Sequence, residues 1–254
     1  MRRFDGARLT ALGTLSLLAF TAVAATSVRT GTPPETHYEG AGTLTHGPAS
    51  CTSFSGDDGT TMFIENIGDF FVGDRVYVSG TVAHNAELCF PHAGLTLEDN
   101  EIMALFEGVG TIGWGPQTCL HLMADSGEGF FIRDTGGFLP GSRVYVVAAV
   151  QEDSQMCWPR IGTGLINTTV WEFFEGSGTL VFGPQGCTGL LADAGGVFML
   201  ENTDGLLPGR RVYVTGLVVE DSDLCWPYVG TSLHDNTIEP LRFYSVAPTI
   251  RMEK

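Results

Sequence analysis

Residues 141–157, GSRVYVVAAVQEDSQMC, decide how this chain is interpreted, because closely related segments occupy residues 73–89 and 209–225. Each copy begins with glycine, contains Arg-Val-Tyr-Val and ends with cysteine, and consecutive copies are 68 residues apart. A fixed period of this length indicates one structural unit repeated along the chain. The period defines three consecutive units with no Gly/Ser- or Pro-rich linker between them, at residues 38–105, 106–173 and 174–243.

The residues within a unit follow a β pattern. Val144, Val146, Ala148 and Val150 alternate with other side chains, which predicts a strand with one apolar face. An Asp-x-Gly turn such as Asp125-Ser126-Gly127 is typical of a hairpin, and the second cysteine is expected in a loop after the alternating strand. We predict an all-β chain, with about five short strands per unit closing into a small barrel.

The six cysteines also follow the period, with one early and one late cysteine in each unit. Six cysteines in three identical pairs are typical of disulfides if the chain is exported, and the repeat reduces the fifteen arrangements to one pattern within units. Metal binding is the rival interpretation, but no second pair and no repeated histidine accompany them. The predicted bridges are Cys51–Cys89, Cys119–Cys157 and Cys187–Cys225.

The order of motifs resembles secreted bacterial domains of the OB-fold type that have no assigned function. The motifs are Gly-x-Gly-Thr, the early cysteine, Asp-x-Gly, Gly-x-Arg-Val-Tyr-Val, the late cysteine and Asn-x-Ile, and they span about residues 38–243. The resemblance implies three tandem, five-stranded Greek-key barrels, each with one internal disulfide. A short loop at residues 66–74 replaces the helix usual between strands three and four. No catalytic residue comes with the resemblance.

Both ends of the chain differ from the units. Residues 1–24 combine Arg2 and Arg3 with an apolar run and small residues, which predicts a cleaved export signal rather than a membrane span. Residues 25–37 are expected to be a flexible segment, and residues 244–254 a tail. We therefore expect a secreted, periplasmic or surface protein of a bacterium, with no stable membrane insertion after cleavage.

The charge is strongly acidic. The formal net charge is −16, and Lys254 is the only lysine. Such a field repels phosphate backbones, so nucleic acid is excluded as a favoured partner. Acids cluster at Glu152-Asp153 and between Glu220 and Asp223, so calcium stays an alternative ligand, although a solvated acidic loop is the simpler interpretation.

Aromatic residues flank the cysteines and are the candidate ligand-binding residues: Trp114, Trp158, Phe182 and Trp226. OB-type barrels bind oligosaccharides or oligonucleotides with the loops that here carry the cysteines. The simpler alternative, which we favour at this point, is that each tryptophan packs over its own disulfide and shields a thin core.

Catalytic motifs are not found. There is no Gly-x-Ser-x-Gly elbow, no His-Glu-x-x-His and no phosphate-binding loop, and His46, His84 and His92 lack metal-ligand spacing. We predict no enzyme activity, no catalytic residue and no metal or other cofactor. The expected function is binding of a glycan, peptide or protein partner; the alternatives are a structural spacer without a ligand, or a calcium-binding or hydrolytic extracellular protein.

Charged residues recur in each unit as well. Glu39, Glu107 and Glu175 are expected to pair with the arginine of their own unit, at Arg75, Arg143 and Arg211 respectively. Such pairs would be structural and of modest energy if exposed.

Overall fold

A computed structural model describes residues 36–89 and 92–241. The predicted export signal at 1–24 and the predicted tail at 244–254 lie outside the described residues. The predicted flexible segment also lies outside them except for its last two residues, where the first strand already begins at Thr36. The described chain is almost entirely β, and its only helical elements are three short 3₁₀ turns.

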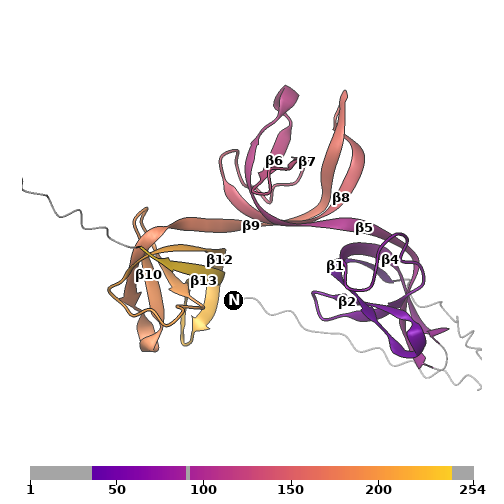
Figure 1. Ribbon diagram of the computed structural model, residues 1–254, viewed down its shortest axis with the longest axis horizontal. Coiled ribbons are helices and arrows are strands. Elements are labelled where there is room, and N and C mark those ends of the chain that lie inside the picture. Colours follow the sequence, from indigo (N-terminus) through magenta and orange to yellow (C-terminus); the bar gives the residue numbers. More distant parts are fainter. Residues whose placement is uncertain (1–35, 90–91, 242–254) are drawn as a thin grey trace, which may run out of the picture. The chain divides into compact units, whose positions relative to one another are not determined.

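Thirteen strands make up the described chain (Figure 1). The first five are β1 (Thr36–His46), β2 (Thr52–Gly56), β3 (Thr61–Ile64), β4 (Arg75–Cys89) and β5 (His92–Trp114). The next four are β6 (Leu120–Ala124), β7 (Gly129–Ile132), β8 (Arg143–Cys157) and β9 (Arg160–Phe182). The last four are β10 (Thr188–Ala192), β11 (Val197–Leu200), β12 (Arg211–Cys225) and β13 (Tyr228–Pro240). The 3₁₀ turns are η1 (Pro48–Ser50), η2 (Pro116–Thr118) and η3 (Pro184–Gly186).

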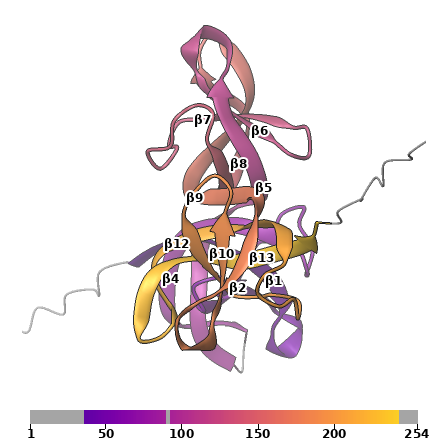
Figure 2. The ribbon, with the colours of Figure 1, turned by 90° about the vertical axis from the view of Figure 1, so that its left-hand side faces the viewer.

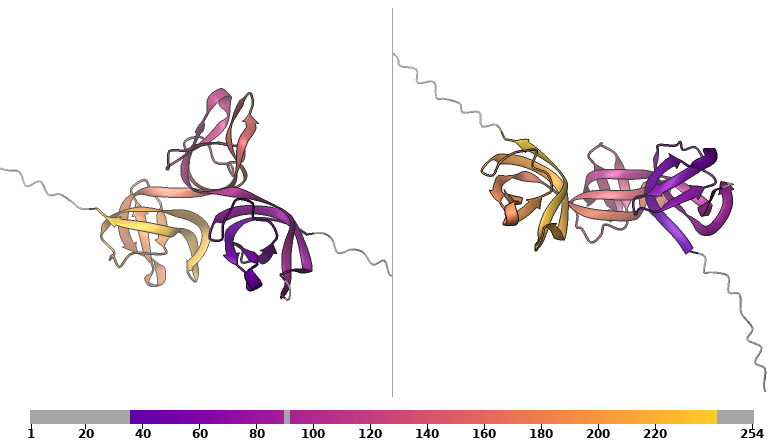
Figure 3. Two further views of the ribbon diagram at one scale, coloured as in Figure 1. Left: turned by 45° about the vertical axis from the view of Figure 1, so that its right-hand side comes forward. Right: turned by 90° about the horizontal axis from the view of Figure 1, so that it is seen from below.

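All thirteen strands belong to one mixed sheet, and the same pairing pattern occurs three times within it. In the first set, β1 pairs with β2, β2 with β3, β3 with β5, β5 with β4, and β4 with β1. Only the β3–β5 pair is parallel. The pairings of each set form a closed cycle, and the strands curve strongly around a common centre (Figures 2 and 3).

Two strands run through the boundaries predicted between units. β5 and β9 are 23 residues long, and neither ends at 105/106 or 173/174. Only the partner changes: Ala104 pairs with Val76 of β4, whereas Leu105 pairs with Ala149 of β8. Consecutive sets are therefore joined by uninterrupted extended backbone, which explains why the sequence has no linker there.

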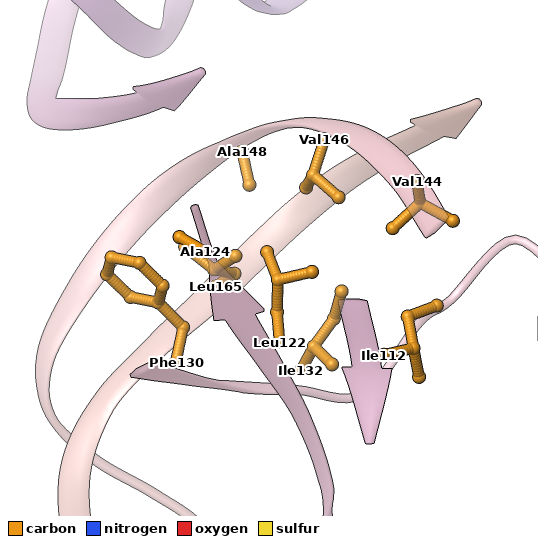
Figure 4. Packing of buried hydrophobic residues seen from close by; sticks show 9 residues of the cluster. All are labelled: Ile112, Leu122, Ala124, Phe130, Ile132, Val144, Val146, Ala148 and Leu165. Carbon is orange, nitrogen blue, oxygen red and sulfur yellow. The ribbon is translucent and has the colours of Figure 1, made fainter. Parts of the chain in front are cut away.

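The alternating strand packs as predicted. In the second set, Val144, Val146 and Ala148 of β8 are fully buried and face Leu122 and Ile132 (Figure 4). Similar clusters of buried apolar side chains occupy the first and third sets. The apolar face of the Arg-Val-Tyr-Val strand therefore supplies part of each core.

The second glycine of the Gly-x-Gly-Thr motif allows two strands to approach closely. A Cβ atom on Gly110 would lie 2.7 Å from the carbonyl oxygen of Met123 on β6. Gly42 and Gly178 have equally close backbone neighbours. Since real Cβ atoms do not approach oxygen so closely, this position requires glycine on steric grounds.

The arginines do not pair with the glutamate of their own unit, so this prediction was wrong. Arg143 Nη1 lies 2.6 Å from Asp125 Oδ1, and Arg143 Nη2 lies 2.9 Å from Glu175 Oε2, one period further along the chain. Arg75 binds Asp57 and Glu107 in the same way. The reason is the continuity of β9. Val144, the neighbour of Arg143, pairs with Glu172 of β9, and the same strand continues to Glu175, which therefore lies near the arginine.

The glutamate of each unit binds a tyrosine of that unit instead of the predicted arginine. Tyr77 donates a hydrogen bond to Glu39, and the Tyr145 hydroxyl donates one to Glu107 Oε1 at 2.6 Å. Burial and Glu39 raise the pKa of Tyr77 to about 12. Burial pushes the pKa of Glu107 upward, but hydrogen bonds from Tyr145 and Arg75 outweigh it and lower that pKa. Hydrogen bonds from Tyr213 and Arg143 likewise lower the pKa of Glu175, so Glu107 and Glu175 each stay ionised between two donors.

Replacement of Gly110 by alanine should destabilise the protein by about 1–3 kcal/mol, because the added methyl group must displace backbone of β6. Gly113→Ala is the matched control on the same strand, since its Cβ would meet no atom closer than 4.0 Å. Urea unfolding of both variants measures the difference. Equal midpoints for the two variants would contradict the steric requirement.

The Asp193–Arg211 pair predicts a contribution to stability that depends on pH. Hydrogen bonds from Arg211 and Ser177 lower the pKa of Asp193 to about 2, below the ordinary value of about 3.9. A depressed folded-state pKa stabilises the fold above pH ~4, and this contribution is lost as the pH falls toward 2. The unfolding midpoints of the wild type and Asp193→Asn should therefore converge over that interval. A constant difference between the two from pH 6 to pH 2 would refute the assignment.

Candidate binding surface at the disulfides

The structure pairs the cysteines as the 68-residue period predicts. The bridges are Cys51–Cys89, Cys119–Cys157 and Cys187–Cys225, each spanning 38 residues with Cα atoms 5.9–6.1 Å apart. The later cysteine does not lie in a loop as expected but is the last residue of β4, β8 or β12. Each bridge therefore joins the turn after the first strand of a set to the end of its fourth strand.

The turn that carries the earlier cysteine is fixed by its own backbone. In the second set, the Gly115 N–H donates to the Cys119 carbonyl at 2.8 Å, and the Cys119 N–H donates to the Pro116 carbonyl at 3.3 Å. Gln117 has a left-handed φ of 58°. The same hydrogen bonds recur after Gly47 and Gly183. A local hydrogen-bonded turn thus sets the direction in which the preceding aromatic residue points.

The aromatic residues beside the bridges are exposed. The exposed fractions are 67% for Trp114, 71% for Trp158, 82% for Phe182 and 75% for Trp226. The expectation that each tryptophan covers its own disulfide was therefore wrong. Cys157 is already buried, with its Sγ 3.4 Å from the Pro116 carbonyl oxygen, so the turn covers the sulfur and leaves the indole in solvent.

Two aromatic residues flank each of the last two bridges. Trp114 pairs with Leu120, the neighbour of Cys119, while Trp158 follows Cys157 directly. The path from Trp114 crosses the strand pair, passes through the bridge and ends one residue beyond it. The Cα–Cα distances along this path add up to about 20 Å, which is the largest separation that the two tryptophan Cα atoms can have. Phe182 and Trp226 have the same relation to Cys187–Cys225.

Further exposed apolar residues, not singled out from the sequence, adjoin these aromatics. Ile161 and Val229 are the second residues of β9 and β13 and follow Trp158 and Trp226 by three positions, and Tyr228 precedes Val229. Ile161 and Val229 are one 68-residue period apart, so the repeat could have indicated them. The first set differs, since His46 and Ala93 stand at the positions of Trp114 and Ile161.

The second set has two surface depressions beside its bridge. One is a polar groove of about 760 Å³ along β8 and β9, lined by Gln151, Ser154 and Asn167 among others. The other, of about 220 Å³, includes both cysteines of the bridge together with Phe131. Arg133 and Met156 line both depressions, so the polar groove lies next to the depression at the disulfide. No sequence motif indicated the groove.

The calcium alternative gains no support from the geometry. Within residues 36–89 and 92–241, no group of three or more His, Cys, Asp or Glu residues is arranged to hold a metal ion. Glu152, Asp153, Glu220, Asp221 and Asp223 are all exposed on the surface. The acidic segments are therefore solvated, which is the simpler of the two interpretations.

Comparison with known proteins gives no family for this chain. No protein-family model matches it, and no curated protein matches it significantly.

Three disulfides indicate an oxidising environment. In the part of the chain that the structure describes, none of the helical elements has the length and apolar character needed to cross a membrane.

Acrylamide quenching should detect the exposed indoles. The wild type should be quenched strongly, because Trp114, Trp158 and Trp226 face solvent, whereas Trp171 is only 38% exposed and contacts Tyr145. A variant with the first three replaced by phenylalanine reports Trp171 alone and is the control. It should be quenched less than the wild type; equal quenching constants would contradict the exposure described above.

Proposed function

We propose that this protein is an exported binding module whose disulfide-bearing surface holds a glycan. The observation that carries the proposal is the set of four aromatic side chains, 67–82% exposed, beside the last two bridges. Burial of a large aromatic side chain is strongly favourable in free energy. Exposed aromatic side chains next to a rigid crosslink are therefore characteristic of a binding surface.

The fold part of the proposal is that each five-strand cycle is a small OB-like Greek-key barrel. The cyclic order 1-2-3-5-4 with one parallel pair supports it. OB-type barrels bind oligosaccharides or oligonucleotides through the loops after strands one and four. The proposed surface uses these two segments, and the disulfide holds them together.

The choice of a glycan follows from the chemistry of the surface. Sugar rings present C–H faces that pack on indole planes, and their hydroxyl groups bond to amides, hydroxyls and carboxylates. The groove beside the second bridge offers such groups at Gln151 and Asn167, which are exposed, with Met156 as an apolar contact. The net charge of −16 disfavours nucleic acids and other polyanions.

The proposed location is outside the cytoplasm of a bacterium, in the periplasm or at the cell surface. The three disulfides support it, and so does the export signal predicted at residues 1–24.

A glycan and peptide array probed with the chain lacking residues 1–24 tests this function. Neutral glycans should bind, and Trp158→Ala should weaken binding by roughly tenfold or more, because central aromatic contacts dominate binding energy. Leu139→Ala removes an equally exposed apolar side chain that lies in neither cysteine-bearing segment and is the matched control. If only peptides bind, the glycan proposal is wrong and the partner is a protein. If nothing binds, the protein is better described as a structural spacer.

A further inference from the structure

Three polar side chains of the third set contact one another in a line. Ser222 Oγ lies 3.3 Å from His234 Nε2, and His234 Nδ1 lies 3.8 Å from Glu201 Oε2. The serine is on β12, the histidine on β13, and the glutamate directly follows β11. This is the order of groups in which a hydroxyl, a base and an orienting carboxylate act together in nucleophilic catalysis.

Backbone groups orient both ends of this line. The Asp235 N–H donates to Glu201 Oε2 at 3.0 Å, which holds the carboxylate beside the imidazole. The Leu224 N–H donates to Ser222 Oγ at 3.3 Å, so the hydroxyl proton is free to point to His234 Nε2. Ser222 stands where the β12–β13 register shifts on both sides, next to Asp221 with a φ of 51°.

The line does not belong to the repeated architecture. The corresponding serine of the second set, Ser154, is buried, and its Oγ accepts from the Met156 N–H at 3.4 Å. Ile166 and Arg133 stand at the positions of His234 and Glu201. In the first set, Ala86, Glu98 and Glu65 stand at the positions of Ser222, His234 and Glu201, so the carboxylate recurs there but the serine and the histidine do not. The second and third sets thus share a serine that accepts a bond from the residue two positions on, whereas the histidine, and with it the complete line, occurs only in the third set.

We propose that Ser222 is a nucleophile activated by His234, with Glu201 as the positioning residue, and that it hydrolyses carboxylic esters. This activity goes beyond the binding function and uses another set of strands. It departs from the sequence-based prediction of no enzyme activity, since the three residues lie in no known motif and only the fold brings them together.

The reaction has two balanced steps. Ser222 Oγ attacks the ester carbonyl carbon while its proton passes to His234 Nε2; the bond to the alcohol oxygen then breaks, and the alcohol leaves with that proton. Water next attacks the acyl-serine with His234 as base, which releases the carboxylic acid and restores the hydroxyl. Glu201 stabilises the imidazolium that forms in each step.

The surroundings of Ser222 select the substrate class. Asp221 and Asp223 flank it and are exposed, and Glu220 lies next to Asp221. Their charges repel anionic acyl donors, so the substrate is a neutral ester. Activated esters with a good leaving group are the most suitable probes, because their breakdown needs the least stabilisation of a developing oxyanion.

The test is covalent labelling of the full mature chain with a neutral fluorophosphonate, followed by peptide mass spectrometry, together with p-nitrophenyl acetate turnover. The label should be found on Ser222 and not on Ser154, which is the internal control. His234→Gln should reduce labelling and turnover on the order of 10²-fold, because it removes the general base but retains a polar side chain.

Urea unfolding of His234→Gln distinguishes loss of the base from loss of the fold, and Ser222→Ala should abolish both label and turnover. Labelling of Ser222 no faster than Ser154, or labelling that persists unchanged in a folded His234→Gln, overturns the proposal. Neither outcome bears on the glycan surface, which the array tests separately with Trp158→Ala.

Discussion

The crosslink between the first turn and the fourth strand of each set is the constraint on which the rest of the structure depends. Each set has only a small core, with nine buried residues in the second cluster. Small cores leave little net stability after chain entropy is counted. Closing a loop of 38 residues stabilises the fold by about 4 kcal/mol in the chain-entropy model, which is comparable to the whole stability of many small domains.

The same crosslink explains how large apolar side chains can be displayed in solvent. In the second set, the Gly-Pro turn hydrogen-bonds to its own cysteine and contacts the sulfur of the other, while both flanking indoles stay exposed. Trp114 and Trp158 are then attached to backbone that is already fixed on both sides. A rigid platform loses little conformational entropy when it binds, which favours affinity.

The sequence predicted those features that depend on spacing along the chain, and it missed those that depend on the path of a strand. The cysteine pairs and the buried face at Val144 and Val146 followed from the period and from alternation. The sequence did not predict that β5 continues across residues 105 and 106, because an aromatic-Glu-Gly segment looks the same at a junction between units and within a continuous strand. The assignment of Arg143 to Glu107 failed for the same reason, since the continuous β9 brings Glu175 to Arg143 instead.

The remaining differences concern what surrounds a side chain rather than its type. The exposure of a tryptophan beside a bridge depends on whether backbone already covers the disulfide sulfur, which cannot be inferred from the composition. The line from Ser222 to Glu201 joins residues of different strands through a register shift that no pattern of residues indicates.

Peptide mapping of the unreduced mature protein tests the central claim most directly. The account predicts three crosslinked peptide pairs, one for each of Cys51–Cys89, Cys119–Cys157 and Cys187–Cys225, and no titratable thiol. A bridge between cysteines of different sets, or thiols that react with alkylating agent before reduction, would contradict it.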